Sequence, residues 1–387
     1  MVVELDDAAL GAVEIARLDG AVDADLVADA QLGQRGGGPD GVQQVLTGVD
    51  GAGEGVEAVV EGTVGDLVDI AAGSDPNVRV QHESPLAYAP RVAVPAPAHP
   101  RDRPIAVFDS GVGGLTVLHE LLVRLPAESF VYLADTARFP YGERGQEELE
   151  RFSLEIGEEL LRHRAKLLVV ACNSAAAAAL PALQARMMQT TLGVDVIGVV
   201  RPGGVHAVAA TRNGRVGVLA TPATVASGAY PGAVAAADPH VVVTQVACPE
   251  LAPLIEDGFP YDERVVETVR SYVAPLRAAG VDTVVLGCTH YPLVRPMLQR
   301  MLGPDVTIIA SGAPLARQVS HVLGARGLAT ERTGEGDYSF LCTGEPEPFR
   351  ALGTRFLQMP LGAVEAVKLE PRVGERDGPR LRAVPVR

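Results

Sequence analysis

The sequence predicts an α/β fold of two doubly wound domains with mainly parallel sheets and a candidate active site in the cleft between them. From residue 105 onward, short β-branched runs alternate with longer segments of helical spacing. This alternation is typical of parallel sheets covered by helices, and near-continuous apolar runs fit strands that are buried on both faces. Because the alternation continues for about 210 residues, which is long for one sheet, we expect two sheets.

Eight strands are expected in this part of the chain, divided between two pseudo-symmetric domains. The expected strands are 105–108, 130–133, 167–170, 196–200, 216–219, 241–246, 284–286 and 306–309. We place the first domain at residues 104–197 and 310–370 and the second at residues 198–309. Residues 371–387 contain five Arg and two acidic residues, and we expect them to form an exposed tail.

The N-terminal quarter carries nearly all of the net charge of −15. Residues 1–100 contain 17 acidic residues, 4 Arg and no Lys, a net charge of −13, which leaves −2 for the rest of the chain. Gly interrupts the apolar stretches, and residues 84–104 contain six prolines. We therefore predict that residues 1–103 are a disordered extension and linker. Two origins stay open: a dispensable extension from an upstream start-site assignment, or a regulatory arm.

Composition also argues against several classes of protein. No charge-free apolar run reaches the length of a transmembrane helix, and the first residues lack the pattern of a secretion signal. The four cysteines have no CxxC spacing, which disfavours a disulfide framework or a structural zinc site. The residues after the first hundred are nearly neutral overall, so they lack the basic charge that is typical of a nucleic-acid-binding surface. We therefore expect a cytoplasmic protein that binds no metal, membrane or nucleic acid.

Two cysteines are the main catalytic candidates. Cys172 and Cys288 each follow a buried strand and a small residue, and each precedes two polar residues at the expected start of a helix. A helix N-terminus favours thiolate, and strand ends of open α/β sheets collect ligand sites. Such a pair suits a racemase that places an acid and a base on opposite faces of a stereocentre. A disulfide oxidoreductase or thiol protease fits the spacing less well, and buried packing is the structural alternative. Cys248 and Cys342 are interpreted as buried packing residues.

Other candidates lie at the ends of expected strands. Asp109 and Ser110 open a Gly-rich turn that could bind an anion or a substrate ammonium, although N-capping of a helix explains them equally well. Tyr141 and Gly142 could offer donors to a carboxylate or form an ordinary turn. His290 could assist proton transfer at the neighbouring thiol.

Four motifs resemble the glutamate racemase family, in the aspartate/glutamate racemase superfamily. They are FDSGVGGLTVL from Phe108, YLADTARFPYG from Tyr132, VVACNSAAAAAL from Val169 and VVLGCTHYPLV from Val284. The resemblance runs from about Pro104 to about residue 330, with weaker support towards residue 370. It implies interconversion of L- and D-glutamate for peptidoglycan without a cofactor.

The resemblance also implies roles for individual residues. Cys172 and Cys288 correspond to the acid/base pair, with Asp109, His290 and Glu256 as helpers, although a solvated helix face is the default interpretation of Glu256. The implied substrate-binding positions are Asp109, Ser110, Tyr141, Gly142, Asn173, Ser174, Thr289 and His290. Neither Lys166 nor Lys368 lies in a context suited to a Schiff base. We expect glutamate as the small-molecule partner, and a homodimer as the assembly.

The chain departs from the family pattern at three places. Ser174 replaces the usual Thr after Asn173, Arg201 replaces Glu in an expected Glu-Pro-Gly, and Ala310 replaces Asp in an expected Asp-Ser. Two alternative functions remain. The first is racemisation of aspartate or of acidic amino acids in general, and the second is a non-catalytic regulatory protein that binds a partner.

Overall fold

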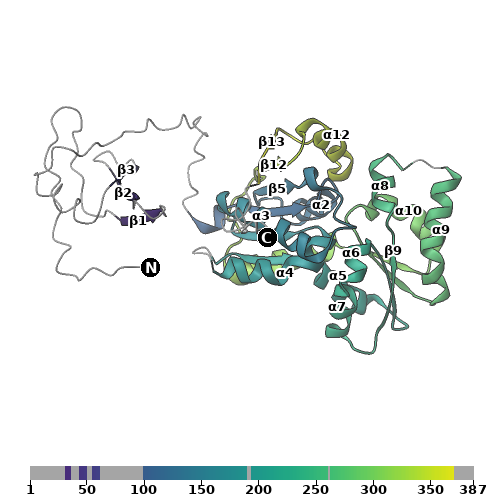
Figure 1. The fold of residues 1–387 in the computed structure, drawn as a ribbon. Coiled ribbons are helices and arrows are strands. Elements are labelled where there is room, and N and C mark those ends of the chain that lie inside the picture. The colour runs from purple at the N-terminus through teal and green to yellow at the C-terminus, as the bar shows by residue number, and fades with distance from the viewer. Residues whose placement is uncertain are drawn as a thin grey trace, which may run out of the picture. The chain divides into compact units, whose positions relative to one another are not determined.

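The structure, a computed structural model (Figure 1), describes residues 99–189, 193–259 and 262–369 and three strands nearer the N-terminus. The chain forms two compact units, Met1–Pro95 and Ala96–Arg387. Strands β1 (Gln31–Arg35), β2 (Gln43–Val49) and β3 (Gly55–Glu61) form an antiparallel sheet in the first unit. These three strands and residues 99–103 lie within residues 1–103, the segment predicted to be disordered. The rest of that segment, and the predicted tail at residues 371–387, lie outside the described residues.

The second unit contains a six-stranded parallel sheet in the order β13-β12-β5-β4-β6-β7. Its strands are β4 (Ile105–Asp109), β5 (Phe130–Ala134), β6 (Leu167–Val170), β7 (Asp195–Gly198), β12 (Tyr338–Cys342) and β13 (Val364–Ala366). Every residue of β4, β5 and β6 is buried, as apolar strands covered on both faces require. The first four strands were predicted, whereas β12 and β13 were not.

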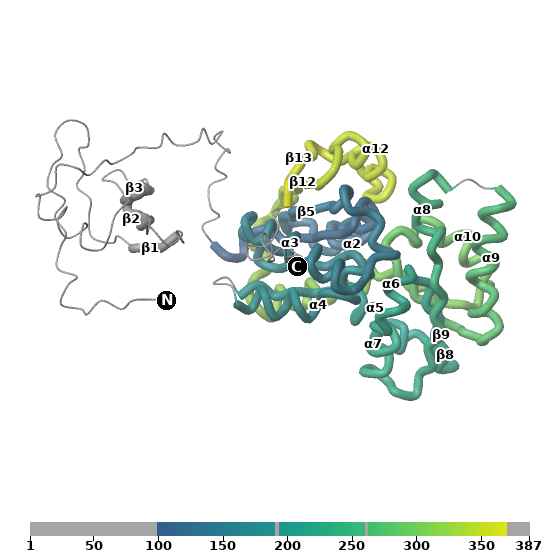
Figure 2. The backbone as a smooth tube through the Cα atoms, in the orientation of Figure 1, coloured from purple at the N-terminus to yellow at the C-terminus, as the bar shows by residue number. Residues whose placement is uncertain are grey.

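A second parallel sheet has the order β11-β10-β8-β9. Its strands are β8 (Arg215–Ala220), β9 (Val242–Ala247), β10 (Thr283–Gly287) and β11 (Thr307–Ala310). All four were predicted, so the expected fold class of two mainly parallel sheets is confirmed. Figure 2 shows the chain leave the first sheet, build the green second sheet, and return as the yellow β12, β13 and α12 beside β5. The exact domain boundaries stay a prediction.

Helices connect the strands of both sheets. They are α2 (Leu115–Arg124), α3 (Gln146–Arg162), α4 (Asn173–Met188), α5 (Val200–Ala210), α6 (Pro222–Ala226), α7 (Ala229–Ala237), α8 (Leu251–Glu256), α9 (Glu263–Ala278), α10 (Arg295–Leu302), α11 (Gly312–Arg326) and α12 (Pro346–Leu357), with 3₁₀ turns η1 (Pro100–Asp102), η2 (Thr136–Arg138) and η3 (Tyr291–Val294). The described helices are all too short or too polar to span a bilayer.

Local sequence explains where a typical helix begins and which face it buries. Asp262 caps α9, because its carboxylate accepts a 2.8 Å hydrogen bond from the Val265 backbone N–H. Val265, Val269 and Val273 then recur every four residues and are buried, which gives α9 one apolar face. The same alternation of buried strand and one-sided helix brings the carboxyl ends of β4, β6, β8 and β10 to the edges where the candidate residues lie.

Candidate active site

One cavity in the second unit gathers most of the predicted site residues. Its empty volume is about 520 Å³, including the solvent at its mouth. The predicted residues on its wall are Ser110, Tyr141, Gly142, Cys172, Asn173, Ser174, Cys288, Thr289 and His290. Both candidate cysteines therefore face the same small space, although they are 116 positions apart in the chain.

Cys172 is held as a thiol by its surroundings. It is the N-cap of α4, where its Sγ accepts a 3.5 Å contact from the backbone N–H of Ala175 and lies 3.8 Å from Oγ of Ser110. Burial raises the pKa of Cys172 to about 12, and the negative charge of Asp109 acts in the same direction. The sulfur is therefore protonated at neutral pH despite the helix N-terminus.

Cys288 lies beside a charged imidazole instead. Its Sγ is 3.7 Å from Nδ1 of His290, and Nε2 of the same ring is 2.8 Å from Oε1 of Glu256. Burial alone would lower the pKa of His290, but the hydrogen bonds to Cys288 and Glu256 outweigh it and raise the pKa to about 10. An imidazolium at this position stabilises negative charge on the Cys288 sulfur. The Glu256 side chain is only 23% exposed and pairs with His290. It therefore does not lie on a solvated helix face.

Asp109 is fully buried and acts electrostatically on Cys172, but it does not lie on the cavity wall. Its Oδ1 accepts a 3.0 Å bond from the Gly111 backbone N–H, and its Oδ2 accepts a 3.2 Å bond from the Thr289 hydroxyl. Burial raises the pKa of Asp109, partly opposed by the positive charge of His290. The side chain does not cap α2, whose N-cap is Gly114 without a side-chain hydrogen bond. The carboxylate instead orders the Gly-rich turn and Thr289.

Asn173 and Ser174 bring two elements around the cavity together. The Tyr230 hydroxyl donates a 2.7 Å bond to Asn173 Oδ1, whereas Asn173 Nδ2 is buried without a partner among the described residues. Ser174 Oγ lies 2.9 Å from Thr221 Oγ1. The serine that replaces the usual threonine therefore keeps its hydroxyl at the cavity wall.

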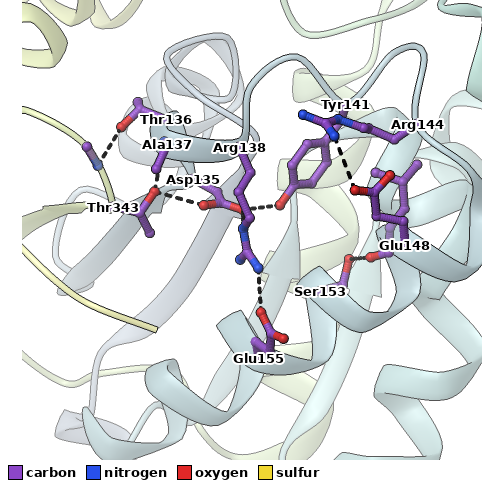
Figure 3. A network of polar contacts seen from close by, with 12 residues as sticks. Asp135, Thr136, Ala137, Arg138, Tyr141, Arg144, Glu148, Ser153, Glu155 and Thr343 are labelled. Atoms are coloured by element: carbon purple, nitrogen blue, oxygen red, sulfur yellow. Dashed lines mark hydrogen bonds and ion pairs between the residues drawn. The ribbon is translucent and has the colours of Figure 1, made fainter. Parts of the chain in front are cut away.

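Tyr141 and Gly142 are held by a network behind the cavity wall (Figure 3). The Tyr141 hydroxyl donates to Oδ2 of Asp135, which also accepts a 2.6 Å bond from Arg138 Nε. Thr343 donates a 2.8 Å bond to Oδ1 of the same carboxylate. Arg138 also pairs with Glu155. This network anchors the segment that carries Tyr141 to the first sheet, while the Gly142 carbonyl accepts a 2.8 Å bond from the Ala223 N–H in α6.

Sequence reasoning missed several residues of this site. Thr221 lines the cavity and caps α6, and Tyr230 holds Asn173. The Thr221-Pro222 pair after β8 was a usable signal, because a strand end followed by an N-cap and a proline marks a helix start. Tyr230 had no such signal, since it lies within α7 and far from any motif.

The remaining candidates lie elsewhere. Cys248 and Cys342 are buried but are absent from the cavity wall. Lys166 precedes β6, at the end of the sheet opposite the cavity, and pairs with Glu128. Arg201 is exposed on α5. Among the described residues, no group of three or more His, Cys, Asp or Glu is arranged to hold a metal ion.

Comparisons with known proteins identify the family. The Asp/Glu/Hydantoin racemase family model matches residues 115–319. A glutamate racemase of Geobacter metallireducens is 45% identical over 266 residues, which cover 69% of this chain and 97% of the relative. A glutamate racemase of Neisseria meningitidis is 41% identical over 269 residues, which cover 70% of this chain and 98% of the relative.

Solved structures agree with these relatives. A glutamate racemase isoform from Bacillus anthracis has a TM-score of 0.66 at 39% identity and covers 70% of this chain and 98% of its own. The glutamate racemase of Francisella tularensis in complex with D-glutamate has a TM-score of 0.64 at 30% identity, covering 70% and 99%. With both thiols in one cavity and relatives matched over nearly their whole length, the chain belongs to the glutamate racemase family.

Proposed function

We propose that this protein interconverts L- and D-glutamate by a two-thiol acid/base mechanism. The observation that carries the proposal is the pair of buried cysteines on the wall of one cavity, with opposite electrostatic surroundings. Racemisation at Cα needs a base on one face of the carbon and an acid on the other. The D-glutamate complex of the Francisella relative supports glutamate as the ligand.

The two sulfurs lie in different electrostatic surroundings. In one direction the Cys288 sulfur, whose negative charge the neighbouring His290 imidazolium would stabilise, acts as the base and removes the Cα proton of the enantiomer whose hydrogen faces it, leaving the electron pair on Cα. Cys172 is the thiol and delivers its proton to the opposite face, so the new C–H bond forms with inversion. One proton leaves the substrate and one arrives, and the cysteines exchange protonation states. The other enantiomer reacts by the same steps in reverse.

The cavity wall supplies groups that bind the substrate and stabilise the carbanion. The buried Nδ2 of Asn173 can donate to a substrate carboxylate, and the hydroxyls of Ser174, Thr221 and Thr289 lie on the same wall. Hydroxyl donors aimed at the α-carboxylate become more favourable as the carbanion delocalises charge onto it. Asp109 does not line the cavity; its carboxylate instead holds the Gly-rich turn and the Thr289 hydroxyl in place. The net charge of the chain contributes little to this binding, because these are local contacts.

Replacing each thiol tests the mechanism. Cys172→Ser and Cys288→Ser should each abolish racemisation of L-glutamate measured by circular dichroism, whereas Cys342→Ser, which changes a buried cysteine away from the cavity, should keep it. In D₂O, the wild-type product should carry deuterium at Cα. If either single variant kept wild-type turnover and exchange, the two-thiol mechanism would be wrong. Faster turnover of L-aspartate than L-glutamate, or inactivity on both, would contradict the proposed substrate.

We propose that the D-glutamate supplies peptidoglycan synthesis, as the family resemblance implies, and that the protein forms a homodimer. Both stay predictions. Depletion of the protein in its host should cause lysis that external D-glutamate relieves, and light scattering should give a mass near twice the 40.3 kDa of the chain.

A further inference from the structure

A tyrosine outside the two-thiol centre fixes one of the cavity residues. Tyr230 in α7 is fully buried, and its hydroxyl bonds to Oδ1 of Asn173 at the start of α4. α7 belongs to the part of the chain that builds the second sheet, whereas α4 follows β6 of the first sheet. The contact therefore joins the elements around the two sheets at the cavity wall.

Two glycines leave the space that the Tyr230 ring occupies. A Cβ atom on Gly287 would lie 3.0 Å from Tyr230 Cε2, and one on Gly203 would lie 3.4 Å from Cε1. Gly287 directly precedes Cys288, and Gly203 lies in the first turn of α5. With close neighbours at both ring edges, the hydroxyl has a fixed position against Asn173.

The hydrogen bonds around the Tyr230 hydroxyl favour one orientation of the Asn173 amide. A tyrosine hydroxyl has a single hydrogen, and burial raises the pKa of Tyr230 further, so that hydrogen is retained. Its nearer acceptor is Asn173 Oδ1 at 2.7 Å, and Ser311 Oγ lies farther away at 3.3 Å. Ser311 has its own acceptor, the carbonyl of Leu286 at 3.1 Å. With Oδ1 engaged, Nδ2 is the atom left to meet a ligand.

We propose that Tyr230 is a positioning residue that orients the Asn173 amide so that Nδ2 donates to a carboxylate of the substrate. This inference rests on the proposed function, because it takes Asn173 to be a substrate contact. If the amide turned over, Oδ1 would face the substrate carboxylate, and two acceptors would repel each other. Since Tyr230 touches neither thiol in the described contacts, its effect should fall on binding rather than on proton transfer.

Tyr230→Phe tests the proposal, with Ser311→Ala as the matched control. Tyr230→Phe deletes the donor to Asn173, and a lost neutral hydrogen bond predicts a rise in KM for glutamate of about 3- to 10-fold with kcat within about twofold. Ser311→Ala removes the other neighbour of the same hydroxyl and leaves the Asn173 bond intact, so KM should stay at or below the wild-type value. Binding of D-glutamate by calorimetry should weaken in Tyr230→Phe by the same factor as KM.

The outcomes separate this inference from the proposed function. If the wild-type protein neither racemises nor binds glutamate, the proposed function fails. If the wild type is active but Tyr230→Phe keeps its KM, or loses kcat at constant KM, Tyr230 does not orient a substrate contact. Equal increases in KM for Tyr230→Phe and Ser311→Ala would indicate general loosening of packing and would also overturn the inference.

Discussion

The carboxylate of Asp135 is the centre of the network that supports the cavity wall, and Asp135→Asn should disrupt it. Asp135 is 0% exposed and accepts from Arg138, from the Tyr141 hydroxyl and from the Thr343 hydroxyl. All three partners are donors, which a carboxylate satisfies with two acceptor oxygens. An asparagine of the same shape turns an NH₂ group towards at least one donor and removes the charge that compensates Arg138.

The expected loss of stability follows from these contacts. Removing one partner of a buried ion pair costs about 3–5 kcal/mol. Arg138 keeps a second carboxylate, Glu155, and stacks 4.0 Å from the centre of the Phe152 ring, so we expect about 2–4 kcal/mol for Asp135→Asn. Glu155→Gln is the matched control. It changes the other carboxylate on the same guanidinium and should cost about 1 kcal/mol, because one hydrogen bond is weakened and Asp135 remains.

Urea denaturation, monitored by circular dichroism, measures the free energy of unfolding of both variants. The two values can be compared provided that the m-values match. Steady-state kinetics of the same proteins should show a higher KM for Asp135→Asn than for Glu155→Gln, because Tyr141 and Gly142 line the cavity. The reasoning fails if the two variants lose equal stability, since the buried carboxylate would then be no more important than its partially exposed counterpart. It also fails if Asp135→Asn is destabilised while KM is unchanged, because the network would then not position the wall.

Two further predictions concern His290. Its pKa is raised above the ordinary 6.5 to about 10, so the stability from its imidazolium is fully present below pH 6.5 and is lost as the pH rises through about 10. The melting temperature and kcat/KM should therefore both fall as the pH rises towards about 10. In His290→Asn, the melting temperature should not show this fall. For Gly113→Ala, the new Cβ would lie 2.4 Å from His290 Nδ1 and from Thr289 Oγ1, and displacing these groups should lower kcat by about 100-fold. Gly145→Ala, with no atom within 4 Å of its Cβ, should remain active, and equal losses in both variants would contradict the clash.

Sequence patterns predicted the strands with recognisable apolar runs, including the partly exposed β9, and missed β12 and β13. All residues of β4 and β10 are buried, so their apolar runs are unbroken. In β12, Tyr338 is half-buried and Ser339 is exposed, and β13 has only three residues. A short strand near a sheet edge gains stability from its neighbour's hydrogen bonds, which leave no periodic mark in its own side chains.

The same distinction applies to the site. Cys172 and Cys288 were accessible to sequence reasoning because strand ends are local features. The resemblance named Glu256 as a helper, but its pairing with His290 was not predicted, since Glu256 lies 34 positions away at the end of α8. Only tertiary packing determines which of the many carboxylates reaches the imidazole. Sequence therefore indicates which groups could react, while the protonation states that select acid and base depend on contacts between elements.

The unequal surroundings of the two thiols also constrain the kinetics. Burial and the carboxylate of Asp109 disfavour a thiolate at Cys172, whereas Cys288 lies beside the His290 imidazolium. The free protein is therefore biased towards the form that deprotonates one enantiomer. L- and D-glutamate have equal free energies in water, so kcat/KM must be the same in both directions whatever the bias. The asymmetry can appear only as compensating differences in kcat and KM between the enantiomers. Weakening it through Glu256→Gln should bring the two sets of constants closer together, because loss of this carboxylate lowers the pKa of His290 and so reduces the fraction of imidazolium beside Cys288.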